Sequence, residues 1–216
     1  MTVLYTPLDI EVEPFESHAV IDWFDANKID EPDYWVFKEG RHEWALAGAS
    51  QPVNDWTKIK PYEDWLAQKF EPSTDAELHF APGFESALPQ IVAAIRQMPF
   101  KEIGAVGLLK QLIEIDPHTD THDPSNPTEP SRIMMFLTEP SENTFYMLDQ
   151  DQVKLAHIHP EYRAFAFNNN AAKHGALPPK DVKILLSVVG ILDHAQHQEL
   201  IERSVAKFAD LVISAL

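Results

Sequence analysis

The sequence predicts a mainly β fold with flanking helices, arranged as a sandwich or jelly roll. From Glu102 onward, the chain consists of short runs rich in β-branched and aromatic residues. Clusters of Pro, Asn, Asp and Ser separate these runs, and no helical pattern lies between them. This arrangement is typical of packed antiparallel sheets and not of a parallel α/β sheet.

The first hundred residues show helical and irregular patterns. Val20, Ile21 and Phe24 share one helical face, while Pro61 opens a short helical segment, and residues 30–56 have no clear period. A second helix is indicated by apolar residues at spacings of three and four, a stripe that suits packing against a sheet. The stripe consists of Phe84, Leu88, Ile91, Val92, Ile95 and Met98.

Seven strands are expected in the second half, and a helix closes the chain. The strand-like runs are 103–109, 112–115, 133–137, 144–148, 153–158, 164–167 and 182–192. The closing helix is indicated by Ile201, Val205, Phe208 and Val212, spaced by four, three and four residues. We therefore expect one domain, 1–216, with a support region over 1–101, a β core over 102–193 and a terminal helix over 194–216.

Composition excludes several classes of function. The chain has 34 acidic and 17 basic side chains, a formal charge of −17, which disfavours nucleic acid and anionic membranes as partners. It has no cysteine, so a metal must be held by His, Asp or Glu. Residues 1–16 lack the basic start and apolar run of a secretory signal, and no stretch is long and apolar enough to span a membrane. A soluble, cytoplasmic protein is expected.

Three residues have the chemistry of a metal site. In an extended chain His118 and Asp120 lie on the same face, and His174 follows the turn at residues 168–170. Two imidazoles and one carboxylate suit a divalent iron centre that leaves coordination positions open. Lys183 begins the strand-like run after His174, where a cation suits a carboxylate beside the metal.

At these residues the chain resembles the iron(II) and 2-oxoglutarate-dependent oxygenases, closest to their prolyl-hydroxylase-like branch. The family pattern is an HxD, a strand that opens with Arg, a Thr-aromatic step, a distal His and a basic residue on the following strand. Here the pattern is met by His118-Thr119-Asp120, Arg132 and the run after it, Thr144-Phe145, His174 and Lys183. The resemblance covers roughly residues 103–192.

The resemblance implies a double-stranded β-helix core, the jelly roll that cupins share. It implies that His118, Asp120 and His174 bind Fe(II), that Lys183 binds the distal carboxylate of 2-oxoglutarate, and that O2 takes the remaining position. The expected reaction is hydroxylation of an amino acid, a peptidyl residue or a small metabolite. Related halogenases have a small residue at the carboxylate position, so Asp120 favours oxygen insertion.

Further residues have possible roles near this site. Arg132 either pairs with a substrate carboxylate at the barrel mouth or neutralises nearby acids. Tyr146 and Tyr162 are candidates for helping Lys183 hold the co-substrate. His122 shares the alternating face of His118 and is either a rim residue or an alternative ligand.

Other interpretations remain open from sequence. A cupin-like metal-dependent isomerase or dioxygenase without 2-oxoglutarate would need His122 as a ligand and would not need Lys183. A non-catalytic jelly-roll protein that binds sugar or peptide would hold no metal. A calcium loop over residues 116–126 lacks the Gly and the closing Glu of that pattern. An HxD can also be an ordinary turn in which Asp120 caps backbone amides.

Overall fold

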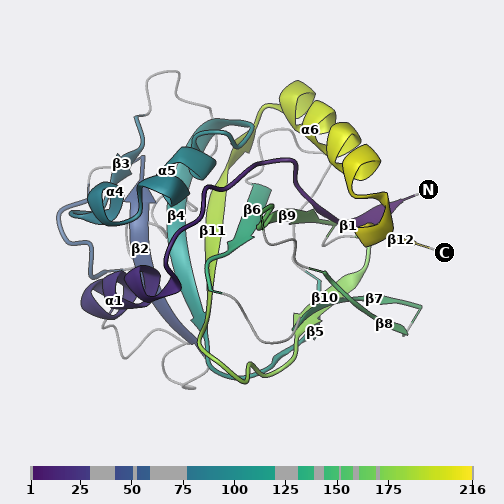
Figure 1. Ribbon diagram of the computed structural model, residues 1–216, viewed down its shortest axis with the longest axis horizontal. Coiled ribbons are helices and arrows are strands. Elements are labelled where there is room, and N and C mark those ends of the chain that lie inside the picture. Colours follow the sequence, from purple (N-terminus) through teal and green to yellow (C-terminus); the bar gives the residue numbers. More distant parts are fainter. Residues whose placement is uncertain are drawn as a thin grey trace.

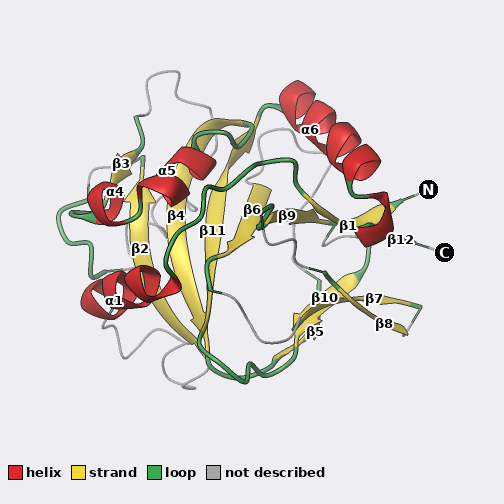
Figure 2. Ribbon diagram, viewed as in Figure 1, coloured by secondary structure: helices red, strands yellow, loops and turns green. Residues whose placement is uncertain are grey.

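A computed structural model describes residues 2–29, 42–50, 53–58, 77–119, 131–138, 144–150, 152–157, 161–168 and 171–215. Two antiparallel sheets form most of this structure (Figure 1, Figure 2). The larger sheet contains, in spatial order, β12 (Ile213–Ser214), β1 (Val3–Pro7), β9 (Ala164–Phe167), β6 (Ser131–Phe136), β11 (Lys183–Leu192), β4 (Phe100–Gln111), β2 (His42–Ala49) and β3 (His79–Phe80). The smaller sheet contains β5 (Ile115–His118), β10 (Lys173–Ala176), β7 (Phe145–Asp149) and β8 (Gln152–Leu155).

The strands from β4 to β11 form a double-stranded β-helix. When these strands are numbered one to eight along the chain, the larger sheet reads 6-3-8-1 and the smaller reads 2-7-4-5. This alternation between two facing sheets is the jelly-roll arrangement. The predicted mainly β fold with a jelly-roll core is therefore confirmed.

The larger sheet is buried on both faces. Along β11, Ile184, Leu186 and Val188 belong to the apolar cluster under the helices, while Leu185 belongs to the cluster between the two sheets. Successive side chains of a strand point to opposite faces, so a strand packed on both sides is apolar throughout. This packing accounts for the nearly continuous apolar run that follows Lys183.

Helices cover the outer face of the larger sheet. α1 (Ser17–Asn27), α4 (Phe84–Ala87) and α5 (Pro89–Ile95) lie beside β2 and β4, and α6 (His194–Lys207) lies against β1 (Figure 1). The predicted stripe from Phe84 to Met98 is buried, but it is divided between two helices. Pro89 disfavours helical geometry at the residue before it, and Leu88 accordingly has φ −133° and ψ 53°.

The first hundred residues contain strands that the sequence analysis did not predict. β1 pairs with β9, and β2 pairs with β4 inside the stretch expected to be irregular. β2 has the sequence HEWALAGA, whose alanines and glycine have low strand propensity, so tertiary pairing determines its conformation. The terminal segment also differs: after α6 the chain forms a short 3-10 helix, Ala209–Leu211, and then β12, which pairs with β1 beside the N-terminus.

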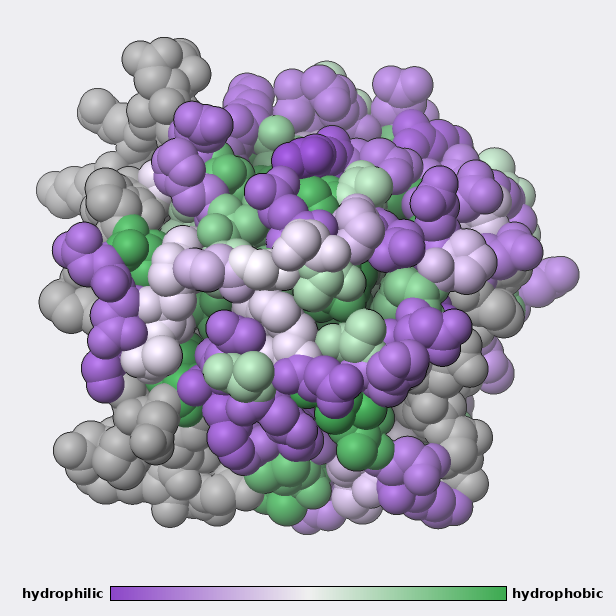
Figure 3. Space-filling model, turned by 60° about the vertical axis from the view of Figure 1, so that its left-hand side comes forward, coloured by the Kyte–Doolittle hydropathy of each residue, from purple (hydrophilic) through white to green (hydrophobic). Residues whose placement is uncertain are grey.

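The surface shows no single apolar face in the view of Figure 3, where hydrophobic residues lie scattered among hydrophilic ones. In the described part of the chain, the helices are too short or too polar to cross a lipid bilayer.

Candidate metal and co-substrate site

Two histidines meet across neighbouring strands of the smaller sheet. His118 on β5 and His174 on β10 are directly opposite each other, and residues paired in this way project from the same face of a sheet. Their ring centroids are 4.4 Å apart, with 53° between the ring planes. His174 is 5% exposed, whereas His118 lies at the surface. The pair therefore extends from the interior of the barrel to its surface.

A backbone contact fixes the tautomer of His118. Its Nδ1 lies 2.8 Å from the carbonyl oxygen of Asp116. A carbonyl oxygen only accepts hydrogen bonds, so Nδ1 carries the proton and donates it. Nε2 then carries the lone pair of the ring, which is the arrangement usual for a metal-binding histidine.

Aromatic side chains enclose His174 on the interior side. The ring centroid of Phe167 is 4.6 Å from that of His174, and the ring centroid of Phe145 is 5.9 Å away. Phe145 belongs to the apolar cluster between the sheets, and Phe167 packs against it. These rings exclude water from one side of the imidazole.

Gly175 allows the strand that carries His174 to approach its neighbours. A Cβ atom at this position would lie 2.5 Å from the hydroxyl of Tyr146 and 2.6 Å from the carbonyl oxygen of Ile115. Tyr146 thus lies on the face of the smaller sheet that Gly175 shares, opposite to the face of His174. Its pKa is raised by burial, and then by the nearby Asp116 and Glu114.

Lys183 is a fully buried cation at the start of β11. Its Nζ donates a hydrogen bond to the hydroxyl of Thr144 and lies 5.8 Å from the centre of the Phe136 ring. Among the described residues, no carboxylate lies within ion-pairing distance of this amine. Burial lowers the pKa of Lys183 to about 7.

The Lys183–Thr144 pair lies a short way along the barrel from His174. Thr144 directly precedes β7, in which Phe145 pairs with Ala176 and Met147 pairs with His174. Thr144 is therefore three residues along the strand from the level of His174, which corresponds to about 10 Å. The histidine pair and the buried amine are therefore separated by about 10 Å along the direction of the strands.

Gln111, next to Lys183, fixes the chain segments that enter β5 and leave β10. It is the strand partner of Lys183 on β4 and is 2% exposed. Its Nε2 donates hydrogen bonds of 2.8 Å to the carbonyl oxygens of Ile113 and Leu177. Ile113 precedes the strand of His118, and Leu177 follows the strand of His174, so one amide holds both connections.

The other predicted site residues lie in different places. Arg132 alternates along β6 with Met134 and Phe136, so it shares the interior face, and it pairs with Val189 at the end of β11 far from Lys183. Asp120 and His122 lie outside the described residues. Within the described ranges, no three His, Asp or Glu side chains cluster at metal-binding distance.

Sequence analysis did not identify Thr144 or Gln111 as contacts around Lys183. It considered Tyr146 and Tyr162 for the role of assisting Lys183, but Tyr146 faces away and the hydroxyl of Tyr162 accepts a hydrogen bond from Lys207. The Thr-aromatic step at Thr144-Phe145 was the available signal. The sequence around Gln111 carried no such signal, because Gln111 lies beside Lys183 only through the pairing of two strands whose residues are 72 positions apart.

Comparisons with solved structures find proteins of related overall shape. A 2OG-Fe(II) oxygenase family oxidoreductase from Burkholderia pseudomallei is 15% identical, with 82% of this chain and 79% of that chain covered and a TM-score of 0.39. A Pseudomonas putida prolyl-4-hydroxylase is 10% identical, with 87% and 92% covered and a TM-score of 0.41. A prolyl hydroxylase from Trichoplax adhaerens, solved with a hypoxia inducible factor peptide fragment, is 10% identical, with 92% and 87% covered and a TM-score of 0.46.

No family model matches the sequence, and no curated protein matches it.

Proposed function

We propose that the chain is a non-haem iron(II) and 2-oxoglutarate-dependent dioxygenase that hydroxylates an amino acid, a peptidyl residue or a small metabolite. The observation that carries this proposal is the buried amine of Lys183. It faces the space between the sheets, and among the described residues its one hydrogen-bonding partner is the neutral hydroxyl of Thr144.

A buried amine without a counter-ion is costly, because burial removes the water that stabilises its charge. The low pKa of Lys183 reflects this cost. A carboxylate ligand would supply the missing charge and accept a hydrogen bond from the amine. The hydroxyl of Thr144 would orient the amine toward that ligand.

The length of 2-oxoglutarate fits the separation between the two parts of the site. Its two carboxyl carbons are about 5 Å apart when the chain is extended. A metal–oxygen bond at one end and a hydrogen bond at the other, each 2–3 Å, extend this reach to about 10 Å. This length matches the spacing along the strand between His174 and Thr144, the hydrogen-bonding partner of the Lys183 amine.

The donor set suits Fe(II). His118 presents Nε2 with Nδ1 held by the Asp116 carbonyl group, and His174 faces it across the sheet. Asp120, two residues beyond His118, is the expected third ligand and completes a set of two imidazoles and one carboxylate. When bound, iron would supply the activation of O2, coupled to oxidative decarboxylation of 2-oxoglutarate to succinate.

The protein residues have separate tasks in this reaction. His118, His174 and Asp120 hold the metal, while Lys183 and Thr144 orient the co-substrate. The rings of Phe145, Phe167 and Phe136 exclude water from the interior side. Arg132, on the interior face at the opposite end of β11, is a candidate anchor for an acidic group of the substrate.

An anaerobic titration tests this function. Fe(II) and 2-oxoglutarate are added to the metal-free protein while the weak visible charge-transfer band of the chelated complex is recorded. We expect the band with the wild-type protein and its loss in His174→Ala, with His197→Ala on α6 as the control. Iron binding without a band would contradict the proposal and favour a cupin-like metal protein that does not use 2-oxoglutarate.

A further inference from the structure

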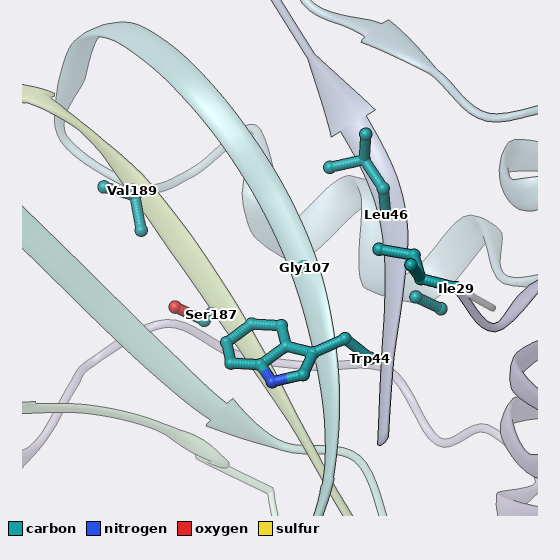
Figure 4. A pocket seen from close by; sticks show the side chains of 7 residues that line it. Ile29, Trp44, Leu46, Gly107, Ser187 and Val189 are labelled. Atoms are coloured by element: carbon teal, nitrogen blue, oxygen red, sulfur yellow. The ribbon is translucent and has the colours of Figure 1, made fainter. Parts of the chain in front are cut away.

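The last residue of β4, Gln111, is held between two neighbouring strands. It pairs with Lys183 on β11 and with His42 on β2. Four residues earlier on β4, the indole ring of Trp44 lies over Gly107 and toward β11 (Figure 4). A Cβ atom on Gly107 would lie 3.2 Å from this ring, so the missing side chain lets the ring pack directly on the strand. The backbone of Gln111 is therefore well fixed in the larger sheet.

The strand that carries His118, β5, is held more weakly. It is a four-residue edge strand, its neighbour among the described strands is β10, and most of its residues are exposed. Pro117 within it has no N–H to donate to a partner strand. The register consists of His174 opposite His118 and Ala176 opposite Ile115, with a shift between the two pairs. The pairing of the strands alone therefore does little to specify their register.

A different register would separate the two histidines. Successive side chains of a strand point to opposite faces, so a slip of one residue moves every side chain to the other face. His118 would then point away from His174, and one metal ion could not contact both rings. The metal site proposed above therefore needs a contact that fixes β5 on β10.

The side-chain amide of Gln111 provides such a contact at the end of this strand pair. Gln111 alternates with residues of the outer cluster and shares the face of Leu109, so its side chain points between the sheets. Its Nε2 donates hydrogen bonds of 2.8 Å to the carbonyl oxygens of Ile113, two residues before β5, and Leu177, directly after β10. The N–H of Leu177 donates in turn to the carbonyl oxygen of Thr144, at 2.8 Å. The amide thus ties the start of β5 to a fixed end of β10.

The chemistry of Gln111 indicates a role other than filling space. The residue is 2% exposed, and its Oε1 has no hydrogen-bonding partner among the described residues. An unpaired buried acceptor is costly, so an apolar side chain of similar length would avoid this penalty. The two carbonyl oxygens only accept hydrogen bonds, and the amide nitrogen has two N–H groups to donate. We propose that Gln111 is a positioning residue that sets the register of β5 on β10 and so holds His118 and His174 together as a metal-binding pair.

This inference rests on the proposed metal site, and two measurements test it without 2-oxoglutarate or turnover. In the metal-free protein, the NOE between the imidazole protons of His118 and His174 reports on the register, because their ring centroids are 4.4 Å apart. The visible absorption of added Co(II), a divalent ion that imidazole also binds, reports on metal binding. The test substitution is Gln111→Met, which has similar length but no N–H donor.

We expect Gln111→Met to lose the NOE between the rings and to bind Co(II) about 10- to 100-fold more weakly, as for other residues that orient metal ligands. Ser204→Ala is the control for a loss of stability, because this buried hydroxyl on α6 accepts a hydrogen bond of 2.9 Å from the N–H of Asp9. It should lower the melting temperature but keep the NOE and the Co(II) affinity. Gln97→Met is the control for the substitution itself, since the Gln97 amide donates to the carbonyl oxygen of Ala93 at the surface.

Three results would overturn the inference. The wild type can lack the NOE between the rings, Gln111→Met can retain the NOE or the Co(II) affinity of the wild type, or Ser204→Ala can lose both to the same extent. The proposed function fails separately if the wild type shows the NOE but does not bind Co(II), or binds it equally well in His174→Ala. In that case the NOE in Gln111→Met decides by itself whether Gln111 sets the register.

Discussion

The amine of Lys183 and the hydroxyl of Thr144 form a hydrogen bond that joins the larger sheet to the segment entering the smaller one. Around this bond the space is apolar, with Phe136, Phe145 and Leu185 in the cluster between the sheets. A cation placed here destabilises the protein unless a ligand neutralises it. The buried amine therefore has a cost in stability in the ligand-free protein, and this relationship leads to the first predictions.

Replacing Lys183 with Met should stabilise the ligand-free protein. Methionine fills similar volume without a charge, so the variant avoids the desolvation cost. The gain should be on the order of 5 kcal/mol at pH 6, as judged from the lowering of the Lys183 pKa from 10.5 to about 7. Thermal unfolding measures it, and Lys173→Met, at an exposed position on β10, should change the melting temperature little.

The stability advantage of Lys183→Met over the wild type should depend on pH. Below pH 7 the amine of Lys183 is protonated in both folded and unfolded chains, so the wild type bears the full free-energy cost of burying the charge. Between about pH 7 and 10.5 the unfolded chain holds a proton that the folded chain lacks, so the free energy of unfolding rises with pH. The advantage of Lys183→Met should therefore shrink across this window, and a constant advantage would contradict a buried, titrating amine.

Co-substrate affinity should also depend on pH through Lys183. The protonated amine binds a carboxylate, so 2-oxoglutarate affinity should fall as the pH rises above about 7. Lys183→Arg keeps its charge throughout this range and should lose that dependence. Calorimetric titrations between pH 6 and 9 measure both proteins, and identical pH profiles would assign the effect to another group.

Removing the hydroxyl of Thr144 should weaken the co-substrate complex. Thr144→Val deletes the hydrogen-bonding partner of the Lys183 amine at nearly constant volume. A hydrogen bond to a charged group predicts a loss of about tenfold or more in 2-oxoglutarate affinity, and Thr144→Ser should restore most of it. Thr6→Val, at a buried position on β1, is the matched control. Equal affinities in Thr144→Val and the wild type would exclude Thr144 from the site.

A methyl group on Gly175 should separate the two histidines. Gly175→Ala would place a Cβ atom 2.5 Å from the Tyr146 hydroxyl and 2.6 Å from a backbone oxygen, so β10 must move. We expect a stability loss of 2 kcal/mol or more, roughly as for other overpacked sites, and weaker metal binding. Gly83→Ala has open space around it but φ 78°, so about 1 kcal/mol should be lost with metal binding intact. Tight metal binding in Gly175→Ala would show that the pairing of His118 and His174 is not needed.

The sequence was sufficient to predict the jelly-roll core because its strands are separated by clear turns. It could not predict β2 or β10. The Ala-rich β2 resembles a helix locally, and β10 is a short segment, Lys173–Ala176, that contains a glycine. Both strands depend on pairing with distant segments, which local propensity does not describe.

At the site, residue types were easier to predict than contacts. His174 and Lys183 could be selected by chemistry and spacing, and the structure places both on the interior side of the barrel. The pairing of Thr144 with Lys183 depends on how the two sheets face each other. The contacts of Gln111 likewise follow from strand register, which a single sequence does not reveal.

The most direct test of the account compares two ligands of Fe(II)-loaded protein under anaerobic conditions. 2-Oxopentanoate has the same metal-binding end as 2-oxoglutarate but lacks the distal carboxylate. If Lys183 binds that carboxylate, the wild type should bind 2-oxoglutarate about 30- to 1000-fold more tightly than 2-oxopentanoate, as expected for a buried charge pair. Lys183→Met should bind the two equally. Equal binding by the wild-type protein, or unchanged discrimination in the variant, would contradict the role of Lys183 on which the proposed function depends.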